Sequence, residues 1–425
     1  MATIESDSVV VHDSTEDHEG PAVKRPRVEE PTSDVHSSEA PVAAQQSEPG
    51  NDPADVNEKP EKSPTNAGRG GKRKFAILLS YCGKGYFGMQ RNPDVRTIEE
   101  DLIQALYKAE AISEDMRDNL GKMFFQRCAR TDKGVSAIRQ LVSVKMYENK
   151  ADKDKINSHL PSQIRVIAII RVTKKFNSKD YCVARSYEYL LPTYALSPTF
   201  EQTRRDFRIT SEQIDKINHL LSQFVGTHNF HNFTSGKSPH EASAKRHIKE
   251  FCCGEKFVAE GIEFLVLRVK GQSFMLHQIR KMIGLVIAII RNIADKEALA
   301  RSFDDSKADI PMAPGLGLML ENVFFDGYNK RYSNDGTHVA LDWEIYHEET
   351  DAFKQEHIYN HIIQTESANG VMMHWLGTIP LHSFSKNKAI GNKDSSTVEK
   401  SEEAEQNKTE LADTTSTESS TYKNV

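Results

Sequence analysis

Residues 127–137 read RCARTDKGVSA and place one carboxylate, Asp132, between two cations, Arg130 and Lys133. The small and polar residues of this stretch predict a loop, and the apolar residues at 141–144 predict that a strand follows it. Because the two cations favour the ionised carboxylate, Asp132 is a candidate nucleophile or base. The alternative is a surface loop with incidental charges, since structural ion pairs also perturb carboxylates.

The loop resembles the catalytic motif of the TruA family of pseudouridine synthases, which reads R-T-D-x-G-V-x-A around a nucleophilic aspartate. The matching residues of this chain are Arg130, Thr131, Asp132, Gly134, Val135 and Ala137. The Cys-Ala pair ahead of the arginine is similar to the eukaryotic tRNA pseudouridine synthase 1 branch. A related branch, which acts on the anticodon arm, usually has Gly in place of Ala129 and stays open as the alternative. The resemblance implies that Asp132 is the catalytic residue.

A second segment, residues 184–189 (ARSYEY), resembles the A-R-x-Y-x-Y strand of the same family. Side chains alternate along a strand, so Arg185, Tyr187 and Tyr189 are expected on one face. The resemblance implies that Tyr187 stacks on the target base. The alternative, judged from the residues alone, is that these tyrosines occupy structural positions in the core or at the edge of the sheet.

A third segment, residues 271–284 (GQSFMLHQIRKMIG), resembles the block whose arginine forms an ion pair with the catalytic aspartate. The resemblance implies this role for Arg280, near the start of an expected helix. The planar guanidinium suits the role because it can hold a carboxylate bidentately without losing its proton. A late block at 313–318 (APGLGL) resembles a family loop beside the cleft, so the resemblance runs from about residue 73 to 385.

Apolar periodicity predicts an α+β fold, because strands and helices alternate without a clean βαβ rhythm. Strands are expected at 75–81, 141–146, 165–172, 181–191 and 262–269, and helices from 97, over 210–224 and over 276–294. The resemblance implies a pseudouridine synthase fold with mixed and antiparallel sheets that flank a central cleft. It divides the core into two α+β subdomains, residues 73–180 and 181–385.

The two ends of the 425-residue chain differ from this core in composition. Residues 1–72 carry 7 Lys and Arg against 15 Asp and Glu, and residues 386–425 carry 6 against 8. Segments so poor in apolar residues cannot offset the entropy of ordering, so both tails are expected to be disordered. The net charge of −6 therefore hides a mildly basic core, which is compatible with a polyanionic partner.

Five cysteines without framework spacing predict reduced thiols in an intracellular protein. No signal peptide or membrane-spanning run is expected, because the longest apolar run is too short to cross a bilayer. The basic runs KRPR at 24–27 and KRK at 72–74 are candidate nuclear import signals. We therefore expect the nucleus as the location, with a mitochondrial pool left open although the acidic N-terminus is unlike a transit peptide.

Two motifs point to other chemistry, and neither is complete. Residues 83–88 (GKGYFG) spell the glycine pattern of a dinucleotide-binding turn, but Asn92 and Pro93 leave no room for the helix that must hold the pyrophosphate. His357 and His361 have the spacing of a zinc helix but lack its glutamate. We predict no metal, no nucleotide cofactor and no oxidoreductase activity.

The resemblance implies an enzyme that isomerises uridine to pseudouridine in folded tRNA and needs no cofactor. Small nuclear RNA and mRNA are further candidate substrates, and the oligomeric state is open. Arg130 is the candidate to fill the space that a flipped uridine leaves, and Lys133, Lys245 and Arg246 are candidate RNA contacts. A non-catalytic RNA-binding protein on the same fold is the alternative from another class.

Overall fold

The computed structural model of the chain describes residues 70–384. The predicted tails and the basic run at 24–27 therefore lie outside the described residues, apart from the last residues of the first tail. The strands are β1 (Lys72–Tyr81), β2 (Gln126–Arg127), β3 (Ser136–Tyr147), β4 (Ile164–Arg171), β5 (Ala184–Pro192), β6 (Gly226–Asn229), β7 (Lys245–Ala259), β8 (Ile262–Gly271) and β9 (Leu318–Phe324).

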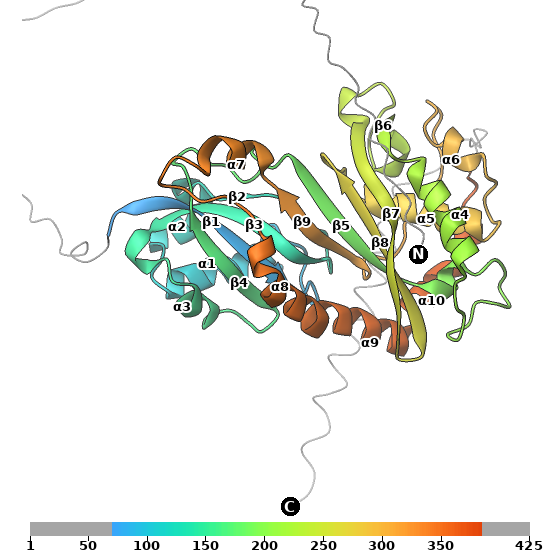
Figure 1. Ribbon diagram of the computed structural model, residues 1–425, viewed down its shortest axis with the longest axis horizontal. Coiled ribbons are helices and arrows are strands. Elements are labelled where there is room, and N and C mark those ends of the chain that lie inside the picture. The colour runs from blue at the N-terminus through green and yellow to red at the C-terminus, as the bar shows by residue number, and fades with distance from the viewer. Residues whose placement is uncertain (1–69, 385–425) are drawn as a thin grey trace, which may run out of the picture. The chain divides into compact units, whose positions relative to one another are not determined.

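Helices surround this set of strands (Figure 1). They are α1 (Ile98–Lys108), α2 (Glu114–Asp118), α3 (Lys153–Asn157), α4 (Ser211–Ser222), α5 (Gln278–Ile290), α6 (Ala298–Arg301), α7 (Asp326–Tyr332), α8 (His347–Phe353), the π-helix η7 (Lys354–Tyr359), α9 (Asn360–Asn369) and α10 (Val371–Leu376). None of them is long and apolar enough to cross a membrane.

The nine strands form one sheet in the order β4-β1-β3-β9-β5-β8-β7-β6, with β2 paired to β3. The β3–β9 pair is parallel and short, joining Ser136 to Met319 and Ala137 to Leu320. The remaining pairs are antiparallel. The α+β class and the mixed sheet are thus confirmed. Residues of both predicted subdomains share the sheet, and the subdomain division stays a prediction.

Local signals in the sequence account for the best-predicted elements. Thr97 accepts a hydrogen bond from the Glu100 N–H and so caps α1, and Thr210 forms a full capping box with Gln213 at the start of α4. Helix α5 buries its apolar residues almost all round. A Cβ at Gly284 would lie 2.1 Å from the carbonyl oxygen of Pro311, so this glycine lets α5 pack closely against the chain that leads to β9.

Strand β9 is the element that joins the early and late parts of the chain. It pairs with β3 on one side and β5 on the other, although it follows them by well over a hundred residues. The helical run α8, η7 and α9 passes along the strands on both sides of β9, those of the early part of the chain and those of the later part (Figure 1). At its centre, Lys354 and Tyr359 bind the buried carboxylate of Glu188 on β5, at 2.6 and 3.1 Å.

Candidate active site

The Asp132 loop, residues 128–135, connects β2 to β3 and is held by side chains from its surroundings. The buried amide of Gln140 on β3 pairs with both backbone groups of Ala129: its Oε1 accepts from the N–H at 3.2 Å and its Nε2 donates to the carbonyl at 2.9 Å. The Thr131 hydroxyl lies 2.8 Å from that of Tyr81 on β1. The backbone on the N-terminal side of Asp132 is thereby fixed.

The glycine-rich turn at 83–88 packs directly on the Asp132 loop. A Cβ at Gly88 would lie 2.6 Å from the Thr131 carbonyl oxygen, and one at Gly83 would lie 2.5 Å from that of Val135. Gly88 also has a φ of +94°, which L side chains rarely adopt. Close approach of two backbones explains these glycines, and α1 begins ten residues after the turn, at Ile98.

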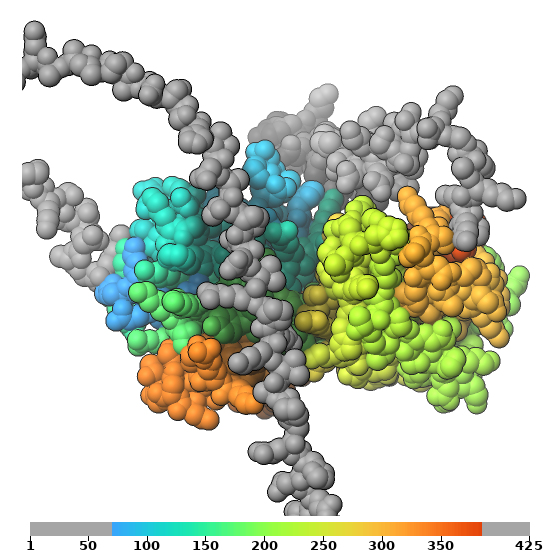
Figure 2. Space-filling view, turned by 90° about the horizontal axis from the view of Figure 1, so that it is seen from above, coloured from blue at the N-terminus to red at the C-terminus, as the bar shows by residue number. Residues whose placement is uncertain are grey.

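Asp132 opens into a cavity of about 610 Å³. Figure 2 shows the surface hollowed between the blue-to-green residues of the first strands and the yellow-green residues of the later ones. Three segments form most of the lining: residues 126–132 with Val135, the start of β5 with Arg185 and Tyr187, and residues 273–279 after β8. Lys179 and Leu318 complete it. The structure thus brings Tyr187 of β5 to the same cavity as Arg130 and Asp132 of the loop, although Tyr187 lies far from them in the sequence.

The Asp132 side chain is 30% exposed, and one basic side chain in the described part of the chain lies within 4.0 Å of its carboxylate. It belongs to His277, whose Nε2 lies 3.9 Å from the carboxylate. His277 precedes α5 and has a φ of +63°, a conformation that non-glycine residues adopt at a cost. The sequence block contained this histidine, but nothing in its spacing indicated the turn that aims it at Asp132.

Arg280 lies in the first turn of α5 and is not among the residues that line the cavity. Its Nε donates to the carbonyl oxygen of Ala313 at 2.7 Å. Burial lowers the pKa of Arg280, and the charge of Asp132 acts in the opposite direction, so the two groups interact electrostatically. The bidentate ion pair with Asp132 stays a prediction, because the two side chains do not approach within 4.0 Å here.

Tyr187 presents its ring to the cavity and is 8% exposed. Phe274 packs edge-on against it, with ring centroids 5.2 Å apart. Burial raises the pKa of the Tyr187 phenol, so the hydroxyl keeps its proton at neutral pH. The site therefore holds a fixed aromatic surface next to an exposed carboxylate.

Arg185 ties the two sides of the cavity together. Its Nε and Nη2 donate to the Cys128 carbonyl at 3.2 and 2.8 Å, and its Nη1 donates to the Gln272 carbonyl at 3.1 Å. One guanidinium thus fixes the Asp132 loop to the segment that carries His277. The sequence placed Arg185 on the face of Tyr187 but gave no sign of this bridging role.

The predicted RNA contacts lie in two places. Arg130 and Lys133 are exposed on the Asp132 loop, and the Lys133 Nζ lies 4.4 Å above the ring centre of Phe87. Lys245 and Arg246 begin β7, opposite β6, and do not line the cavity. Their role in RNA binding stays a prediction. Within residues 70–384, no three His, Cys, Asp or Glu side chains lie together as a metal site would require.

Comparison with known proteins supports the resemblance seen in the sequence. Residues 220–326 match a family model described as tRNA pseudouridine synthase. The chain is 51% identical over 318 residues to the pseudouridylate synthase 1 homolog of Mus musculus, which covers 74% of this chain and 75% of the relative. It is also 51% identical over 315 residues to the Homo sapiens homolog (73% and 74% covered).

A more distant relative gives the same result. The tRNA pseudouridine synthase 1 of Yarrowia lipolytica is 35% identical over 383 residues and covers 71% of this chain and 72% of the relative. Identity at this level over most of both chains accompanies a cavity in which an aspartate, a tyrosine and an arginine of the expected motifs meet. The chain belongs to the tRNA pseudouridine synthase family, a family of isomerases.

Proposed function

We propose that the chain converts selected uridines of folded tRNA to pseudouridine, with Asp132 as the catalytic carboxylate. One observation carries the proposal: Asp132 stands on a firmly held loop and faces a cavity of about 610 Å³ together with Tyr187. A cavity of several hundred Å³ is the size that encloses a small ligand such as one nucleoside.

The reaction is an isomerisation, so it needs no oxidant, reductant or group donor. The bond between the ribose and a ring nitrogen breaks, the uracil turns, and a ring carbon forms the new bond to the ribose. The ring carbon then loses its proton, and a ring nitrogen holds one in its place. Asp132 acts either by covalent addition or by removing a sugar proton, and both routes need its ionised form.

The other cavity residues keep the detached uracil in place. The Tyr187 ring provides a flat surface on which the base can stack, and Phe274 keeps that ring from turning. Arg185 holds the two walls of the cavity together, and His277 stands 3.9 Å from the Asp132 carboxylate. A fixed enclosure matters because the free base must turn over without escaping or meeting water.

The target uridine must leave its stack before it can reach Asp132, at a cost of a few kcal/mol. Arg130 is exposed at the mouth of the cavity, two residues before Asp132. Its long cationic side chain can enter the space that the uridine leaves and contact the phosphates beside it. We assign it to this role, and Lys133, Lys245 and Arg246 to contacts with the RNA backbone.

The substrate range and the location are part of the same proposal. Folded tRNA is the main substrate, selected by shape and backbone, with small nuclear RNA and mRNA as further substrates. The nucleus is the compartment, supported by the basic run at 24–27. Replacing that run by alanines in a fluorescent fusion tests the location: nuclear accumulation should fall, and unchanged accumulation would contradict the assignment.

The catalytic assignment is tested by mapping pseudouridine at nucleotide resolution in tRNA transcripts incubated with the pure protein. The wild type should modify a defined set of uridines. The Asp132→Asn variant keeps the size of the side chain and removes its charge, so it should modify none while binding tRNA with unchanged affinity. Pseudouridine formed by the variant would overturn the role of Asp132.

A further inference from the structure

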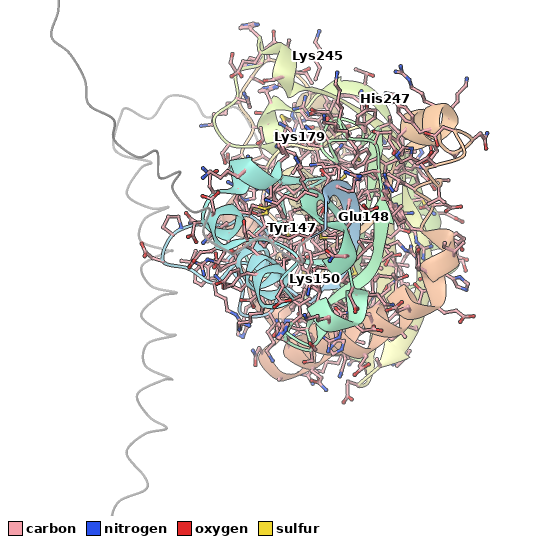
Figure 3. The ribbon with its side chains drawn as sticks, turned by 90° about the vertical axis from the view of Figure 1, so that its left-hand side faces the viewer. Tyr147, Glu148, Lys150, Lys179, Lys245 and His247 are labelled. Atoms are coloured by element: carbon pink, nitrogen blue, oxygen red, sulfur yellow. The ribbon has the colours of Figure 1, made fainter. Side chains whose placement is uncertain are left out.

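A second cavity, of about 850 Å³, lies at the start of β1 and is strongly basic. We call it the basic groove and define it by its lysines and arginines: Lys72, Arg73, Lys74, Lys145, Arg171, Lys174 and Lys175. These residues come from β1, β3 and β4 and from the chain that leads to β5. Figure 3 looks at the molecule from this side, where Tyr147, the neighbour of Lys72 across the strands, is labelled.

The positive charge of the groove is balanced only in part within the described residues. Lys74 and Lys145 are direct cross-strand neighbours, an arrangement of like charges that destabilises a sheet. The nearby carboxylate of Glu148 pairs with two other cations of the groove, Arg73 and Arg171, at 3.4 and 3.0 Å. Neither Lys74 nor Lys145 has a carboxylate within 4.0 Å in the described part of the chain. An anion from outside would relieve this repulsion.

Lys74 is the clearest case of a groove cation without a carboxylate partner, because its side chain is largely buried. Its Nζ donates to the carbonyl oxygen of Phe124 at 2.5 Å, and burial lowers its pKa to about 8. No neighbouring negative charge offsets that burial. A sheet with one apolar residue at this position would be more stable, so the lysine indicates a role in binding rather than in folding.

An exposed aromatic ring stands among these cations. Phe124 is 61% exposed and has a φ of +49°, a backbone conformation that a non-glycine residue adopts at a cost. The Lys74 hydrogen bond holds its carbonyl, and the Lys145 Nζ lies 5.9 Å from the ring centre. A flat ring beside lysines is the combination that binds a nucleotide, with the base stacked and the phosphate on the cations.

The basic groove adjoins the active-site cavity through β2. Gln126 lines both cavities, and it stands two residues after Phe124. Lys179 lines the active-site cavity on the same side, close in sequence to Lys174 and Lys175 of the groove. A nucleic-acid strand that leaves the active-site cavity over Gln126 would therefore enter the basic groove.

We propose that the basic groove binds a single-stranded segment of the substrate RNA next to the target uridine. Its phosphates contact the lysines, and one base stacks on Phe124. This inference rests on the proposed function and adds to it where the RNA leaves the active site. An acidic peptide is the weaker fit, because it would use the lysines but give no reason for an exposed aromatic ring held in a costly conformation.

The test measures tRNA affinity in the Asp132→Asn background, so that turnover does not interfere. The groove variants are Lys174→Ala/Lys175→Ala and Phe124→Ala. The matched control is Lys216→Ala/Lys296→Ala, which removes the same charge from exposed positions on and after helices α4 and α5. Circular dichroism melting of each variant checks that the fold is intact.

The groove pair should bind tRNA at least tenfold more weakly than the control pair. The slope of log Kd against log salt concentration should fall by about 1.5, because each lost phosphate contact removes about 0.7–0.9 of a counterion. Phe124→Ala should weaken binding about five- to 100-fold without changing that slope, since stacking carries no charge. Phe124→Trp should restore the affinity.

Three outcomes would overturn the inference about the groove. The first is that the groove pair and the control pair bind tRNA with equal affinity. The second is that Phe124→Ala binds tRNA as tightly as its parent. The third is that the groove substitutions weaken the binding of polyglutamate more than the binding of tRNA. The proposed function fails separately, if Asp132→Asn still forms pseudouridine. The two results are distinguishable because one measures binding and the other measures product.

Discussion

The Asp132 loop and the basic groove lie on either side of the two-residue strand β2, and they are built in opposite ways. The loop is tied by Gln140, Tyr81 and Arg185, each through backbone or side-chain hydrogen bonds. The groove gathers cations from β1, β3 and β4, and two of its lysines, Lys74 and Lys145, are direct cross-strand neighbours. The difference indicates that chemistry needs fixed geometry, whereas binding of a flexible polyanion needs charge and one flat ring.

After the complete loss of rate expected for Asp132→Asn, the largest effect on the loop side is expected from Arg280→Lys. A lysine cannot donate to the Ala313 carbonyl while it also faces Asp132, because it lacks the planar fork of the guanidinium. Burial at this position would also favour its neutral form, in which the positive charge is lost. Loss of a charged hydrogen bond costs about 2–3 kcal/mol, so the single-turnover rate at saturating tRNA should fall about 30- to 150-fold. A near-normal rate would remove Arg280 from the site.

A smaller effect is expected from Arg185→Lys. An ammonium cannot reach the carbonyls of Cys128 and Gln272 together, so the loop and the segment with His277 should move apart. At about 1–2 kcal/mol for the lost hydrogen bonds, kcat should fall about five- to 30-fold with little change in tRNA affinity. A change in affinity alone would mean that Arg185 belongs to the binding surface.

The glycine turn offers a matched pair of substitutions. Gly88→Ala puts a Cβ against the Thr131 carbonyl and strains a φ of +94°, whereas Gly85→Ala strains a φ of +74° and meets nothing within 4 Å. In both variants the strain should lower the free energy of unfolding by about 1–3 kcal/mol, and both should therefore melt at a lower temperature. Gly88→Ala alone should also lower kcat several-fold, and equal rates would show that the turn does not position Asp132.

The smallest effect is a pH dependence on the groove side. The pKa of Lys74 is lowered to about 8, so this lysine is charged at pH 7 and neutral at pH 9. The neutral amine attracts no phosphate, and tRNA affinity should therefore fall about two- to threefold across this range. Lys74→Arg should remove the decline, because arginine stays protonated. A decline of the same size in that variant would assign it to another group.

The part of the fold that could be predicted from the sequence consists of elements with regular local signals, such as helix caps and apolar periodicity. The capped helices α1 and α4 and the apolar helix α5 were placed to within a few residues, because periodicity and caps are written in neighbouring positions. Strand β7 was not predicted, since it is exposed along much of its length and its register shifts twice. Strand β9 was interpreted only as a loop beside the cleft, since its partners lie far away in sequence.

The site divides in the same way. Motif positions predicted Asp132 and Tyr187, and the structure places both on one cavity. Arg185 as a bridge, His277 in its left-handed turn and the groove around Phe124 were not predicted. Each of these three features depends on backbone conformation or on residues from several strands. Such features leave no pattern in neighbouring positions of the sequence.

The most direct test measures two constants, the single-turnover rate at saturating tRNA and the tRNA Kd, for Asp132→Asn and for Lys174→Ala/Lys175→Ala. A fixed catalytic loop beside a separate binding groove predicts that Asp132→Asn loses all detectable rate and keeps the wild-type Kd. The lysine pair should keep the rate and raise the Kd at least tenfold. The account is contradicted if Asp132→Asn turns over tRNA, or if both variants lose rate and affinity together.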